Sequence, residues 1–178
     1  MVENISFESS GSAILIAGDA NYWYESGGVK DVTIWNNEFR YPCMSSEYQF
    51  CEGIISIFPE IPEVDVKYPF HRNKTIESNH FKPFDYPILF AKSVQCIEFA
   101  NNTITRNNMI EPFHPKKAGL TFIVCQDIIV ENNNIIGDVL RKTLDLINTP
   151  IRELKLHDSN FKLIKKKVAP DSFPLLKD

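Results

Sequence analysis

The segment 32–39 reads VTIWNNEF: apolar and polar side chains alternate, and the alternation ends in two asparagines and a phenylalanine. Strict alternation is typical of a β-strand with one buried face. The same pattern returns four times, as KTIESNHF (74–81), IEFANNTI (97–104), IIVENNNI (128–135) and LKLHDSNF (154–161). A strand pattern that occurs five times, followed each time by a similar polar pair, predicts a fold made of repeated units.

The spacing of the copies supports this interpretation. The base period lies in the low to mid twenties, with insertions, which is typical of a solenoid. The segment ISFESSG (5–11) is a degraded further copy. A second, apolar and β-branched strand precedes each copy: AILIA (13–17), GIISI (53–57), PILFA (87–91), LTFIV (120–124) and TLDLI (143–147). The two sets of strands are expected to stack as two parallel sheets.

The predicted fold is therefore all-β: a right-handed parallel β-helix, or solenoid, of about five to six coils with loop insertions. Residues 1–161 form the coils. Residues 162–178, which carry lysines and two prolines, form a C-terminal cap or tail, because both residue types block the edge of a sheet. The strand pattern begins almost at Met1 without a cap, which predicts further coils or a subunit at the N-terminal edge.

The polar pair has a structural explanation in this fold. A coil must bend sharply where one strand ends, and asparagine tolerates the left-handed conformation of such a bend. Stacked at one corner, the asparagines of successive coils form an amide ladder. The apolar residues that follow stack inward, namely Phe39, Phe81, Ile104, Ile135 and Phe161. A ligand-binding row of asparagines is the alternative.

Composition narrows the function. The net charge of -4, from 19 basic and 23 acidic residues, argues against a nucleic-acid surface. No apolar run approaches the length of a membrane span, and the N-terminus shows no signal peptide. The cysteines form no zinc-binding spacing and the histidines share no ligand-like spacing, so no metal site is expected. Cys43 and Cys51 flank one loop that a disulfide would bridge, whereas Cys96 and Cys125 are expected to be buried.

Function is expected in the insertions that leave the coils. The first three, at 18–31, 40–52 and 58–73, are rich in aromatic and acidic residues, the mixture that a sugar site needs. Aligning AILIAGD with IISIFPE and PILFAKS places Asp19, Glu60 and Lys92 near one corner. Two carboxylates one coil apart suit a glycosidase, so Asp19 and Glu60 are the candidate catalytic acids. The alternative is a surface ladder in which Lys92 neutralises its neighbours.

The amino-acid sequence of these loops resembles that of a known family. The segments LIAGDANYWYESGGVKDVTIWNNEF (15–39), CEGIISIFPEIP (51–62) and FHRNKTIESNHFKPFDYPILFAKSV (70–94) look like glycoside hydrolase family 110. The resemblance covers roughly residues 2–135. It implies a hydrolase of terminal α-1,3-linked galactose on glycans that acts with inversion and without a cofactor. Members of that family are mostly exported proteins.

The resemblance also assigns residues. It implies that Asp19, Trp23, Glu25 and Glu60 border the galactose pocket rather than perform the chemistry. Tyr22 and His71, in the same insertions, are further candidates for binding substrate. The family's main acids lie in an Asp-Asp pair of an earlier coil, and this sequence contains no such pair. The chain is therefore expected to be the C-terminal part of the family's β-helix, without the coil that carries those acids.

Two other functions stay open at this point. One is a carbohydrate-binding β-helix module without catalysis. The other is a polysaccharide lyase on the same scaffold. A lyase usually needs a basic site for an acidic substrate, whereas these loops are acidic, so it ranks last.

Overall fold

The computed structural model describes residues 1–19, 26–42, 52–61, 63–65, 67–84, 87–109, 118–137, 143–157 and 160–166. These residues form β-strands joined by short turns, with one turn of 3-10 helix, η1 (Ile151–Glu153). No helix in this part of the chain is long and apolar enough to cross a lipid bilayer.

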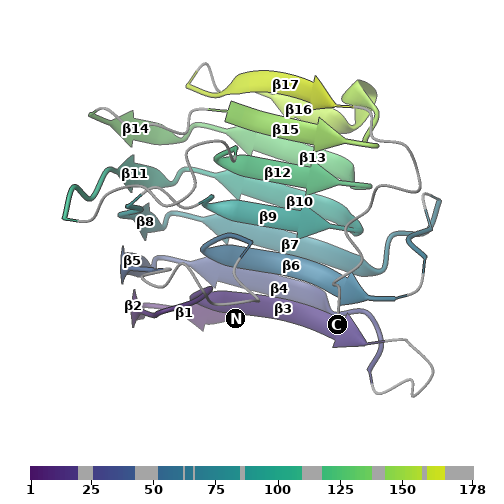
Figure 1. Ribbon diagram of the computed structural model, residues 1–178, viewed down its shortest axis with the longest axis horizontal. Helices are drawn as coiled ribbons and strands as arrows, with labels where there is room; N and C mark the ends of the chain where they lie inside the picture. The colour runs from purple at the N-terminus through teal and green to yellow at the C-terminus, as the bar shows by residue number, and fades with distance from the viewer. Residues whose placement is uncertain are drawn as a thin grey trace.

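The coils stack along one axis, so that three parallel sheets run along the helix, and the chain passes from one sheet to the next in turn (Figure 1). Sheet A contains β1 (Val2–Glu3), β4 (Lys30–Trp35), β7 (His71–Glu77), β10 (Val94–Ala100), β13 (Gln126–Glu131) and β16 (Leu154–Leu156). Sheet B contains β2 (Ser6–Glu8), β5 (Glu38–Tyr41), β8 (His80–Phe81), β11 (Thr103–Thr105) and β14 (Asn134–Ile136). Sheet C contains β3 (Ile14–Asp19), β6 (Ile55–Glu60), β9 (Leu89–Lys92), β12 (Leu120–Ile123), β15 (Thr143–Ile147) and β17 (Lys162–Lys166).

This arrangement confirms the predicted parallel β-helix. Every strand pairs in parallel with its counterpart in the next coil, as in the run Ile14 to Asp19 against Ile55 to Glu60. Among the described residues the chain completes five coils of three strands, and β16 and β17 begin a sixth. The strand β17 lies in the segment predicted as the cap and extends sheet C by pairing with β15.

The number of sheets differs from the prediction. The apolar strands do form one sheet, sheet C, but the first four repeats, such as VTIWNNEF, each contribute to two sheets rather than one. Its alternating part lies in sheet A and its last residues lie in sheet B. The polar pair between them bends the chain, so residues on its two sides cannot share a sheet.

The first residue of each polar pair makes this bend by taking the left-handed conformation. The φ angles at this corner lie between 54° and 58°, at Asn4, Asn36, Ser78, Asn101 and Asn132. In residues other than glycine this conformation causes steric strain, which asparagine and aspartate tolerate best. The predicted role of asparagine at the bend is thus confirmed for the first member of each pair, and the second member has a different role.

The second residue of each pair forms the predicted amide ladder inside the helix. These asparagines are at most 3% exposed. Asn37 Nδ2 donates to Asn79 Oδ1 at 3.0 Å, Asn79 Nδ2 to Asn102 Oδ1 at 3.1 Å, and Asn102 Nδ2 to Asn133 Oδ1 at 3.0 Å. Each oxygen also accepts the backbone N–H of the preceding coil, as Asn79 Oδ1 does from Asn37. The ladder therefore satisfies buried backbone and side-chain groups together.

Apolar side chains stack inward next to the ladder. The rings of Phe7 and Phe39 are 4.9 Å apart with planes 7° from parallel, and those of Phe39 and Phe81 are 4.6 Å apart at 2°. Ile104 continues this column above Phe81, and Phe39, Phe81 and Ile104 are fully buried. Cys125 is buried as expected, but Cys96 is exposed, because it takes the left-handed conformation with φ 59° within β10 and faces Asp127.

Replacing the ladder residue Asn79 by alanine should lower the free energy of unfolding by about 3 kcal/mol or more. The substitution leaves the Asn37 amide, the Asn37 N–H and the Ile34 carbonyl without their buried partner, and each such group costs about 1–3 kcal/mol. The matched control is Ser78→Asn, which places the residue type that best suits φ 58° at the neighbouring position and should be nearly neutral. Urea denaturation measures both. Equal losses of stability in the two variants would mean that the buried ladder position 79 and the bend position 78 do not differ in the way described.

Truncating the stacked ring at Phe81 should also cost about 3–5 kcal/mol, because the cavity adds to the lost burial of the ring. The adjacent His80 points outward and is partly exposed, so His80→Ala should cost about 1 kcal/mol or less. Denaturation midpoints compare the two variants. A similar midpoint for both would mean that the inward and outward positions of β8 are assigned to the wrong residues.

Candidate functional site

Two insertions leave the helix side by side at the corner between sheets C and A. In the third and fourth coils this corner is short: Ser93 alone separates β9 from β10, and Val124 and Cys125 separate β12 from β13. Ser93 and Val124 turn the chain with φ angles of 56° and 51°. After β3 and β6, by contrast, ten residues precede the next strand of sheet A, 20–29 and 61–70 respectively. Because β3 and β6 are neighbours in sheet C, these two insertions start next to each other.

The predicted acids stand at the starting points of the two insertions. Asp19 is the last residue of β3, Glu60 is the last residue of β6, and the two are register partners. Adjacent strands lie about 4.8 Å apart, so the two residues occupy neighbouring rungs. Both are partly exposed. The predicted alignment of Asp19 with Glu60 is therefore confirmed.

Lys92 does not share this rung. Ala91 pairs with Ile57, which places Lys92 level with Phe58, two residues before Glu60. The register thus offsets Lys92 from the two acids by two residues, because the one-residue corner at Ser93 follows Lys92 directly, whereas β6 continues for two more residues. Burial lowers the pKa of the Lys92 ammonium.

The base of the first insertion is closed by hydrogen bonds and close packing. The Asp19 N–H donates to Ser26 Oγ at 2.8 Å, and the Ser26 N–H donates to the Asp19 carbonyl at 2.9 Å. The returning backbone at Gly28 lies so close to Phe70 that a Cβ there would be 1.9 Å from the Phe70 carbonyl oxygen. The second insertion therefore ends directly against the returning strand of the first.

Two ionisable side chains lie buried beneath this corner. His71 Nδ1 accepts the N–H of Val29 at 3.2 Å, and Lys74 Nζ donates to the Val29 carbonyl at 2.8 Å and to the Arg72 carbonyl. Burial lowers the pKa of His71 to about 4, against a smaller opposing effect of the Phe58 carbonyl, so the imidazole is neutral at pH 7. Burial also lowers the pKa of Lys74 to about 8, although Asp31 acts in the opposite direction.

The structure places His71, which the sequence predicts as a substrate-binding residue, behind the candidate site. Its side chain is fully buried, so it does not reach the surface near Asp19 and Glu60. The other predicted residues, Tyr22, Trp23 and Glu25, lie outside the described residues, as do Cys43 and Cys51.

Sequence reasoning missed Lys74, although the sequence contains a signal for it. Lys74 opens its copy of the repeat, KTIESNHF, at a position where the other copies carry Val32, Ile97, Ile128 and Leu154. The structure confirms that these residues are register partners across sheet A. A lysine in a column of aliphatic residues is a polar exception to the apolar core, and the aligned repeats make it visible in the sequence.

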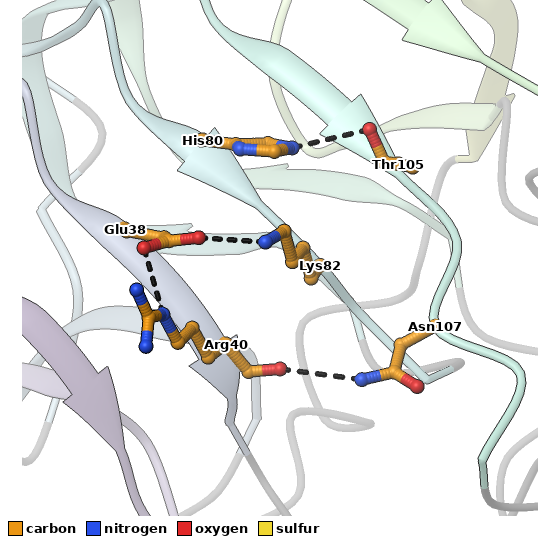
Figure 2. A network of polar contacts seen from close by, with 6 residues as sticks. All are labelled: Glu38, Arg40, His80, Lys82, Thr105 and Asn107. Atoms are coloured by element: carbon orange, nitrogen blue, oxygen red, sulfur yellow. Dashed lines mark hydrogen bonds and ion pairs between the residues drawn. The ribbon is translucent and has the colours of Figure 1, made fainter.

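A second polar cluster covers the outer face of sheet B (Figure 2). Glu38 accepts from Lys82 at 2.6 Å and from Arg40 at 2.7 Å, and these bonds, first Lys82 and then Arg40, hold the pKa of Glu38 below its usual range. His80 Nε2 is hydrogen-bonded at 3.1 Å to Oγ1 of Thr105 in the next coil, and Figure 2 shows this contact.

This cluster is not part of the candidate site. Sheet A separates the two regions, because its strands begin at the corner of Asp19 and end at the asparagine corner. A carboxylate held ionised between two cations is a poor proton donor, so the Glu38 cluster is best explained as a surface network. Across the described ranges no three His, Cys, Asp or Glu side chains gather closely enough to hold a metal ion.

Comparison with known proteins shows several relatives, although no protein-family model matches the chain. The chain is 53% identical over 166 residues to the alpha-1,3-galactosidase B of Bacteroides thetaiotaomicron, which covers 93% of this chain and 27% of that protein. It is 39% identical to an alpha-1,3-galactosidase B of Phocaeicola vulgatus, covering 74% of this chain and 22% of the relative. It is 37% identical to an alpha-1,3-galactosidase A of Bacteroides fragilis, covering 87% and 26%. The chain thus spans about a quarter of the length of these relatives.

The close approach at Gly28 gives a test of how the two insertions pack. Gly28→Ala should lower the free energy of unfolding by about 1–3 kcal/mol, because the added methyl group meets the Phe70 backbone. Gly27→Ala is the matched control: its Cβ would meet nothing within 4 Å, so its effect should stay within about 0.5 kcal/mol. Chemical denaturation measures both. If alanine were tolerated equally at the two positions, the returning strand would not pack on Phe70 as described.

Proposed function

The chain belongs to the family of the alpha-1,3-galactosidases, glycoside hydrolase family 110, and on this basis we propose that it acts on glycans that end in α-1,3-linked galactose. The observation that supports a sugar site at one place on the helix is the pairing of Asp19 with Glu60 at the roots of two adjacent insertions. Carboxylates bind sugar hydroxyls through charge-assisted hydrogen bonds, which are stronger than neutral ones.

The proposed chemistry is hydrolysis with inversion. One carboxylic acid protonates the oxygen of the leaving group, and a carboxylate on the opposite side of the sugar activates a water molecule. Such a pair stands about 6.5–9.5 Å apart. Side chains on neighbouring rungs can splay to this separation from backbones about 4.8 Å apart. In this proposal Tyr22 and Trp23 stack on the galactose ring, and Glu25 accepts hydrogen bonds from its hydroxyls.

A carbohydrate-binding module without catalysis is the second candidate. The pairing of Asp19 with Glu60 supports it as well, because carboxylates accept hydrogen bonds from sugar hydroxyls whether or not a bond is cleaved. On this alternative Asp19 and Glu60 border a galactose pocket and hold the sugar without cleaving it. The two candidates share the same surface and differ in whether galactose is released.

A disaccharide with terminal α-1,3-linked galactose tests the site. Asp19→Asn and Glu60→Gln should each weaken its binding by roughly tenfold or more, because each removes a charge-assisted acceptor worth about 1.5–3 kcal/mol. Calorimetry measures binding, and galactose release is followed in parallel. The control is Glu98→Gln, which removes a carboxylate from the outer face of sheet A and should leave affinity unchanged.

The outcomes separate the two candidates. Release of galactose that both acid substitutions abolish supports the hydrolase, and binding without release supports the module. Unchanged affinity in both acid variants would rule out the Asp19–Glu60 edge as the sugar site.

A further inference from the structure

The inward columns of sheet A contain two polar residues in one coil. Lys74 is 2% exposed and stands in the column of Val32, Ile97, Ile128 and Leu154. His71 is fully buried and pairs with Val94, which is also fully buried. Both polar residues therefore occupy positions where the neighbouring coils carry aliphatic side chains.

The packing of the β-helix does not require these two residues. Burying an ammonium group is costly, and the neighbouring coils fill the same column with the aliphatic side chains of Val32 and Ile97. His71 adds a second cost, because a polar ring is fully buried at a position that Val94 fills with an aliphatic side chain in the next coil. Such costs are expected where a core position serves the function of a nearby site rather than the fold.

What the two residues share is Val29. His71 Nδ1 accepts the Val29 N–H, and Lys74 Nζ donates to the Val29 carbonyl. Val29 is the last residue of the first insertion, immediately before β4. Together the two side chains bind both polar groups of the peptide backbone at the point where the insertion returns to the helix.

The fixed segment leads directly to the candidate site. Three residues before Val29, Ser26 exchanges two hydrogen bonds with Asp19, at 2.8 and 2.9 Å. Between them, the Gly27 carbonyl and Gly28 pack on Gly18 and Phe70. A short and closely packed run of backbone therefore connects the buried His71 and Lys74 to the carboxylate at the end of β3.

We propose that His71 and Lys74 are positioning residues for the galactoside site: by holding Val29 they fix the returning segment 26–29 and thereby the place of Asp19 beside Glu60. Neither residue touches the sugar. The inference rests on the proposed function for its effect on binding, and on geometry alone for its effect on the segment 26–29.

The test replaces each residue by the aliphatic type of its own column, as His71→Val and Lys74→Ile. Three quantities are measured at pH 7: the melting temperature, amide hydrogen exchange at Ser26 and Val29, and the Kd for the α-1,3-galactosyl disaccharide. We expect only a small fall in melting temperature, because Val29 is half-buried and water can replace its lost partners. Exchange should be at least tenfold faster at the two amides, and the Kd at least tenfold higher. His71→Gln keeps an acceptor for the Val29 N–H and should restore much of the protection and affinity. Ile97→Val, in the same column as Lys74, should change neither the exchange nor the Kd.

Each outcome bears on the proposal. A large fall in melting temperature with exchange accelerated throughout the helix would assign both residues to general stability and overturn it. Unchanged exchange at Ser26 and Val29 would overturn it as well. Faster exchange at these amides with an unaltered Kd would overturn the link to the sugar. If the unmodified chain binds no galactoside, the proposed function fails, and the exchange data still decide whether the two residues hold the segment.

Discussion

Parallel pairing in strict register is the constraint on which the whole molecule depends. Because each strand lies directly over its counterpart, any residue that recurs in the repeat forms a column along the helix axis. The asparagine ladder is the clearest consequence: one side chain per coil satisfies its own amide, the amide of the coil below and a backbone N–H, all in the buried interior. The stacked phenylalanines follow from the same register.

The same constraint creates the candidate site. Asp19 and Glu60 are far apart in the sequence, yet register places them on adjacent rungs, and the corner that the upper coils close with Ser93 or Val124 opens beside them into two insertions. The interior below is adapted to this opening, since the only coil among the described residues with both a histidine and a lysine in the inward columns of sheet A is the one that carries β7. Scaffold and site therefore meet at Val29, whose N–H and carbonyl both bind buried side chains.

Much of this could be predicted from the sequence, because repetition makes register visible. The repeated strands, the inward Phe39 and Phe81, the amide ladder and the pairing of Asp19 with Glu60 all follow from aligning copies. The bend within each repeat could not be located as firmly, since an alternating pattern reads the same whether or not it crosses a corner, and three sheets formed where two were expected. Burial of His71 was missed because a histidine after an insertion looks like a loop residue. Cys96 proved exposed because its left-handed backbone conformation interrupts the alternation of β10.

The corner between sheets C and A has a consequence for how such proteins diversify. A single left-handed residue and a segment of ten residues connect the two sheets equally well, because the strand pairing on either side is the same in both cases. Loop length at this corner is therefore decoupled from the scaffold. A binding surface at this corner can be lengthened or shortened while the pairing of the strands in sheets A and C stays the same. Ser93 and Val124 mark the places where new recognition loops could be grafted onto the same helix.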